Sequence, residues 1–146
     1  MAGNILIYGS YGYTGKLITE LAVKAGLKPT LAGRTESALR EHAEPLGLPF
    51  RRFGLDEHDA VVDGLEGMST VIHCAGPFSR TAVPMANACI DTGTHYLDIT
   101  GEVEVFEALY AMDERAQNAH IMLMPGAGFD VVPSDCLAAH LKRRLP

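Results

Sequence analysis

The chain has 146 residues, about the size of one domain, and 47% of them are hydrophobic while 21% are charged. This balance predicts a packed globular core and excludes an intrinsically disordered chain. A net charge of −6 argues against a nucleic-acid partner, because such proteins usually present a basic face. No apolar run approaches the roughly 20 residues of a membrane span. The three cysteines follow neither a CxxC nor a zinc spacing, so we expect a cytoplasmic protein with reduced thiols and no metal.

Six short apolar runs, bounded by Gly or Pro, have the pattern of buried parallel strands. They are residues Asn4–Tyr8, Thr30–Ala32, Phe50–Phe53, Thr70–Cys74, Tyr96–Ile99 and Ile121–Met124. Nine of the 15 glycines follow these runs, on the sheet edge where open α/β folds bind ligands. Five others, Gly64 among them, follow predicted helices.

Helical patterns fill the segments between the strands. The alternation predicts an α/β Rossmann-type doubly wound parallel sheet of about six strands flanked by helices, in a single domain over residues 1–146. Six helices are expected. The first has an apolar stripe from Leu17 to Ala25, the second covers residues Ser37–Glu44, and the third covers residues Asp56–Val62. The fourth has Pro84 in its first turn and runs to Thr92, the fifth has an apolar stripe of Phe106, Leu109, Met112 and Ala116, and the sixth begins at Pro133.

The strongest motif directly follows the first strand and opens the first helix. Its sequence is Gly9-Ser10-Tyr11-Gly12-Tyr13-Thr14-Gly15. Glycines at this spacing allow a tight turn, a close approach of backbone N–H groups to a pyrophosphate, and packing of the helix on the sheet. The alternative is a purely structural turn. The sequence fits neither a P-loop nor the Tyr-x-x-x-Lys pair of short-chain dehydrogenases.

Arg34 follows the second strand, where an NAD site would have an acidic residue for the ribose 2′-hydroxyl. A guanidinium at this place favours the 2′-phosphate of NADP, with Thr35 or Ser37 as an additional hydroxyl donor. Glu36 keeps NAD possible. The alternative is a solvated Arg34 paired with Glu36 or Glu41.

Two further loops lie at the same predicted edge. Ala75, Gly76, Pro77 and Phe78 follow the fourth strand, where small residues let the backbone lie against a cofactor. Phe78 either walls the nicotinamide side or packs in the core. After the fifth strand, Asp98 and Glu102 either orient a substrate or cap the next helix. The sequence identifies no catalytic residue.

Five ordered motifs, GSYGYTGKL, AGR, CAGPF, ACIDTGTHYLDITGE and GAGFDVVPSD, resemble those of the saccharopine dehydrogenase-like oxidoreductases, which include trans-acting enoyl reductases. The resemblance runs from Asn4 to Leu141 and implies a Rossmann domain that binds NAD(P). It assigns the pyrophosphate to Gly9, Gly12 and Gly15, with Tyr11, Tyr13 and Thr14 around them, the 2′-phosphate to Arg34, and the nicotinamide-side loop to Ala75–Phe78. Tyr11 replaces a small residue of the family pattern, which predicts a narrower pyrophosphate seat. Thr81 or Ala82 stands where the family often has Gly.

The resemblance also implies a function for a longer protein. We expect an NADP-dependent oxidoreductase that transfers hydride to or from an imine or enoyl-type small-molecule substrate. A second domain downstream, absent from these 146 residues, would supply the substrate pocket and often the dimer contact, so that the isolated domain would be inactive and would expose an apolar surface suited to a homodimer. The alternative is a non-enzymatic NADP-binding sensor or scaffold.

Overall fold

A wholly parallel sheet of six strands organises the computed structural model, which describes residues 3–129 and 131–145. The strand order is β3-β2-β1-β4-β5-β6, so the direction of chain progression reverses between β1 and β4. This arrangement confirms the predicted Rossmann-type fold. The strands are β1 (Ile5–Tyr8), β2 (Thr30–Gly33), β3 (Phe50–Arg52), β4 (Thr70–His73), β5 (His95–Asp98) and β6 (Leu123–Met124).

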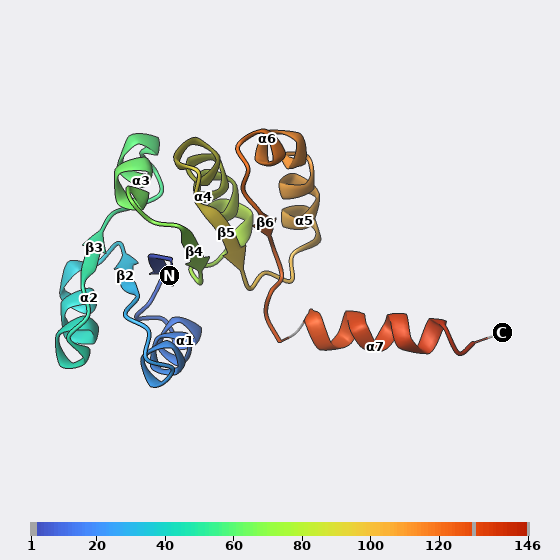
Figure 1. The fold of residues 1–146 in the computed structure, drawn as a ribbon, viewed down its shortest axis with the longest axis horizontal. Helices are drawn as coiled ribbons and strands as arrows, with labels where there is room; N and C mark the ends of the chain where they lie inside the picture. Colours follow the sequence, from blue (N-terminus) through green and yellow to red (C-terminus); the bar gives the residue numbers. More distant parts are fainter. Residues whose placement is uncertain (1–2, 130, 146) are drawn as a thin grey trace.

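Helices cover both faces of this sheet, as Figure 1 shows. One face carries α1 (Tyr13–Lys24) and α2 (Glu36–Ala43), which is followed by the short 3₁₀ helix Glu44–Leu46. The opposite face carries α3 (His58–Leu65), α4 (Phe78–Thr92), α5 (Val103–Tyr110) and α6 (Asp113–Asn118). The last helix, α7 (Val132–Lys142), extends away from the sheet, and all of its residues are exposed.

The central strand β1 is buried on both faces, which explains its unbroken apolar sequence. Successive strand residues point to opposite faces. Leu6 and Tyr8 accordingly join the core cluster that contains residues of α3, α4 and α5, whereas Ile7 joins a second cluster with Leu31 and Leu39. The two clusters fix the sheet between its helical layers and bring the ends of β1, β2 and β4 to one edge.

The structure corrects the predicted start of the fourth helix. α4 begins at Phe78, and Pro84 lies inside it rather than in its first turn. A proline removes one helical N–H, here the donor to the Arg80 carbonyl. Burial of Met85 and Cys89 along the same helix offsets the loss.

Two other expectations are also corrected. The predicted helix over Phe106–Ala116 is divided into α5 and α6, with a turn at Ala111 and Met112. Leu109 and Ala116 are buried in spite of the turn. The prediction that these residues face the core is therefore confirmed, whereas the prediction of one continuous helix is wrong. Gly64 does not follow α3 but lies within it, where a Cβ would stand 2.5 Å from the Phe53 ring.

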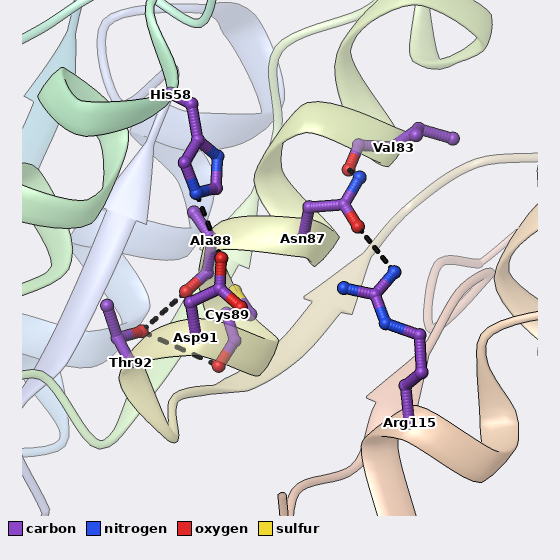
Figure 2. Close-up of polar contacts among 8 residues, drawn as sticks. All are labelled: His58, Val83, Asn87, Ala88, Cys89, Asp91, Thr92 and Arg115. Atoms are coloured by element: carbon purple, nitrogen blue, oxygen red, sulfur yellow. Dashed lines mark hydrogen bonds and ion pairs between the residues drawn. The ribbon is translucent and has the colours of Figure 1, made fainter.

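Polar contacts join the helices of the α3–α6 layer (Figure 2). His58 Nε2 of α3 lies 2.9 Å from Asp91 Oδ2 of α4, and Arg115 of α6 donates to Asn87 Oδ1 of α4 at 2.8 Å. α4 is therefore tied to a neighbour on each side. None of the helices in the described part of the chain combines the length and apolar character needed to cross a membrane.

Candidate functional site

The turn after β1 packs Gly9 and Gly15 so closely against neighbouring residues that neither position has room for a Cβ. Gly9 has φ +79°, and a Cβ there would lie 2.9 Å from the Ala75 Cβ. A Cβ on Gly15 would lie 2.7 Å from the Ser10 Cα. Gly9 N–H donates to the Ala32 carbonyl at 2.8 Å, and Gly12 N–H donates to Gly9 at 3.0 Å. Side chains at these positions would separate α1 from the sheet edge.

The N-terminus of α1 has the character of an anion site. Gly12 is its N-cap residue, and no side chain caps the helix. The first turn also carries no acidic residue, so nothing in that turn offsets the positive end of the helix dipole. N–H groups at such an end bind a phosphate readily.

A hollow of about 210 Å³ lies at the point where the strand order reverses. The turn after β1 contributes Gly9, Tyr11 and Gly12 to its lining, and the end of β2 contributes Arg34. Ala75 and Gly76 line it from the loop after β4. The structure therefore brings three of the predicted segments together at one hollow, on the edge where Rossmann folds bind dinucleotides.

Other predicted site residues lie elsewhere. The Ser10 side chain is fully buried, and its Oγ has no hydrogen-bond partner. Tyr13 is 84% exposed, Thr14 is half-buried in the first turn of α1, and neither lines the hollow. Phe78 also lies off the hollow, with its ring edge-on to His73 at 5.4 Å between centroids. Of the two alternatives for Phe78, the contact favours packing against the core.

Arg34 is exposed at the rim of the hollow. Glu36, one of its two expected partners, is engaged by Arg40 at 3.0 Å on the same face of α2. Arg40 also reaches Glu44 at 3.3 Å. No ion pair of Arg34 is found in the part of the chain that the structure describes, which leaves its guanidinium available to an anionic ligand.

The loop after β4 is held from within α4. The Thr81 hydroxyl donates to the Ala75 carbonyl at 2.7 Å, with the Pro77 carbonyl 3.1 Å away. The Gly76–Pro77 peptide is cis. Thr81 is one of the two residues expected where the resembled family often has Gly, and its hydroxyl bonds fix the shape of the loop.

Asp98 and Glu102 both act as hydrogen-bond acceptors within the fold. Asp98 is fully buried and accepts from Tyr96 Oη at 2.6 Å, Gly126 N at 2.8 Å and Thr100 N at 3.0 Å. It thereby joins β5 to the loop after β6. Asp130 of the last sequence motif lies outside the described residues.

Glu102 caps a different helix from the one predicted. Its carboxylate accepts from the N–H groups of Phe78 and Ser79, both at 2.9 Å, in the first turn of α4 rather than α5. Hydrogen bonding from Ser79 is the main cause of the lowered pKa of Glu102, and it outweighs desolvation. The contact favours a structural role for this carboxylate.

Three further residues line the hollow: Tyr8 and Cys74, to which sequence reasoning gave no role in the site, and Gly33, which it placed at this sheet edge without naming it as a cofactor contact. Strand register could have found them, because Tyr8 lies level with Ala32 of β2 and His73 of β4. Burial, with a smaller contribution from Asp98, raises the pKa of the Cys74 thiol to about 12, which makes it a poor nucleophile. No cluster of three or more metal-ligating side chains occurs within residues 3–129 and 131–145.

The family model described as saccharopine dehydrogenase NADP binding domain matches residues 5–124. The trans-acting enoyl reductase of Mycobacterium leprae is 34% identical over 152 residues, which cover 97% of this chain and 36% of that protein. The saccharopine dehydrogenase-like oxidoreductase of Bos taurus is 24% identical, with coverage of 97% and 38%. The chain thus spans about a third of the length of the curated relatives it matches.

Solved structures agree on the fold. Saccharopine dehydrogenase (L-Glu forming) from Saccharomyces cerevisiae superposes with a TM-score of 0.74 at 23% identity, over 88% of this chain and 28% of that one. The Citrobacter sp. triphenylmethane reductase complexed with NADP(H) gives a TM-score of 0.62 at 15% identity, over 80% and 46%. On the family match, which covers most of its length, this chain belongs to the saccharopine dehydrogenase NADP-binding domain family.

Proposed function

We propose that this chain binds NADP(H) at the hollow between β1 and β4, as the cofactor domain of an oxidoreductase. The observation that carries the proposal is the uncapped N-terminus of α1, with no acidic residue in its first turn, opening at that hollow beside Gly9 and Gly12. The backbone N–H groups at the N-terminus of α1 would hold the pyrophosphate. Arg34 would hold the 2′-phosphate, and Ala75 and Gly76 would lie along the nicotinamide side. The bound nicotinamide would donate or accept the hydride.

Binding measurements test the proposal directly. Isothermal titration calorimetry of the 146-residue chain should detect NADPH, and Arg34→Ala should weaken NADPH by roughly tenfold to a hundredfold, the loss of one or two charge-assisted hydrogen bonds. NADH should bind the variant as it binds the wild type. Arg115→Ala, which removes a cation from α6 on the opposite face of the sheet, is the matched control. Absence of binding of either nucleotide at millimolar concentration would refute the proposal, and equal weakening of both by Arg34→Ala would refute the role of Arg34.

We further propose that the substrate pocket, for an imine or enoyl-type small molecule, lies in a second domain. The greater length of the relatives supports this division. So does the engagement of the polar groups near the hollow, since Asp98 and Glu102 are bonded within the fold and the Cys74 thiol stays protonated. Exposed Leu137 and Leu141 of α7 offer an apolar surface for that domain or for a homodimer. The 146 residues alone should bind NADPH without oxidising it when imines or enoyl thioesters are added, and turnover would contradict this division.

A further inference from the structure

The Tyr11 ring lies against the end of β2, not across the pyrophosphate turn. A Cβ added to Gly33 would stand 2.6 Å from Tyr11 Cε1 and 3.3 Å from its Oη. A Cβ at this position would force the ring to shift from its observed place. The phenol hydroxyl is thus placed beside Gly33, the residue directly before Arg34, and Tyr11, Gly33 and Arg34 all line the hollow.

The ring is held in this place by the core of the α1–α2 face. Tyr11 packs against the cluster that contains Ile7, Leu31 and Leu39, and its side chain is only partly exposed. A ring fixed by packing loses little conformational entropy when its hydroxyl engages a ligand. The hydroxyl is therefore preorganised at the rim of the hollow.

The surroundings of the hydroxyl make it a good donor. Burial raises the pKa of Tyr11, but hydrogen bonding from Thr35 and the peptide of Arg34, with the Arg34 charge, lowers it below its ordinary value. A phenolic hydroxyl can donate a hydrogen bond as well as accept one. A dianionic phosphate is the ligand group that gains most from such a donor beside a guanidinium.

We propose that the Tyr11 hydroxyl donates a hydrogen bond to the adenosine 2′-phosphate next to Arg34 and so selects NADP over NAD. This inference rests on the proposed cofactor site, because the residues after β2 are where a Rossmann domain meets the 2′ position of the ribose. It assigns Tyr11 to the adenosine end of the cofactor, whereas the family pattern places this loop residue at the pyrophosphate.

The test compares Tyr11→Phe, which keeps the ring and removes the hydroxyl, with the wild type and with Tyr110→Phe as control. Tyr110 is 79% exposed on α5. The probes are NADPH, NADH, 2′,5′-ADP and 5′-ADP, with dissociation constants from calorimetry. Tyr11→Phe should weaken NADPH and 2′,5′-ADP by roughly tenfold, the loss of one hydrogen bond to a charged group, and leave NADH and 5′-ADP unchanged. Tyr110→Phe should alter none of the four.

The outcomes separate this inference from the proposed function. Wild-type binding of NADPH with no selective loss in Tyr11→Phe overturns the role of Tyr11 alone, as does an equal loss for NADPH and NADH. A wild-type chain that binds neither nucleotide overturns the proposed function and this inference together. NADH affinity also reports on folding, so a variant that binds NADH normally and NADPH weakly supports the inference whatever its melting temperature.

Discussion

His73 is predicted to make the stability of this protein fall between pH 7 and pH 5. Its ring is fully buried at the end of β4 among Tyr8, Phe78 and Tyr96, and neither ring nitrogen has a hydrogen-bond partner. Burial lowers the pKa of His73 to about 3. The folded protein therefore keeps the ring neutral over a range in which the unfolded chain, with a His pKa of about 6.5, takes up a proton.

The sign and size of the effect follow from this difference. Because the unfolded state binds more protons between the two pKa values, stability decreases as the pH falls through that range. For a folded pKa well below 5, the loss from pH 7 to pH 5 is about 2 kcal/mol, out of the 5 to 15 kcal/mol typical of a domain. The result hardly depends on the exact folded pKa, provided that the ring is still neutral at pH 5.

Replacement of His73 by Leu isolates this contribution. Urea unfolding followed by far-UV circular dichroism at pH 7, 6 and 5 gives the free energy of unfolding of each protein. The free energy of unfolding of His73→Leu, taken relative to that of wild type, should rise by about 2 kcal/mol from pH 7 to pH 5, because only wild type loses the contribution of the neutral His73 ring. His140→Gln, which removes an exposed histidine of α7, should keep the wild-type dependence. If His73→Leu and wild type lose stability in parallel, the ring is not held neutral in the core and the reasoning fails.

Two carboxylates give the remaining predictions. Asp98→Ala strands three donors, from Tyr96, Thr100 and Gly126, in the interior, and should lower the free energy of unfolding in urea by about 3 to 5 kcal/mol. A loss no larger than that of Glu102→Ala, whose carboxylate is near the surface, would contradict this assignment. Hydrogen bonds from the start of α4 lower the pKa of Glu102 in the folded protein. The carboxylate therefore contributes to the free energy of unfolding above the unfolded pKa of about 4.3, and this contribution disappears as the pH falls through the folded pKa. Urea unfolding of wild type and Glu102→Gln should therefore converge in acid, and a gap that persists to pH values well below 4 would exclude the capping role.

The strands and the glycine turn were predictable because their signals are local. The period of apolar residues around β1 and the Gly9–Gly15 spacing each lie within one short segment. The partner of Glu102 was not predictable in this way. Its two donors lie 23 and 24 residues earlier, at the start of a helix whose position depends on how β4 and β5 pair. The sequence indicated a capping acid but assigned it to the following helix, α5, instead of α4.

Gly33 shows the same limit at the candidate site. Its place directly after the predicted strand Thr30–Ala32 put it on the sheet edge where ligands bind, and it does line the hollow. The structure gives it a second role, because the Tyr11 ring occupies the space that a Cβ on Gly33 would need. The two residues are 22 positions apart, and only the pairing of β1 with β2 brings them together. A ligand that enters the hollow therefore meets a phenol at this strand end, rather than the bare backbone that the glycine alone would suggest.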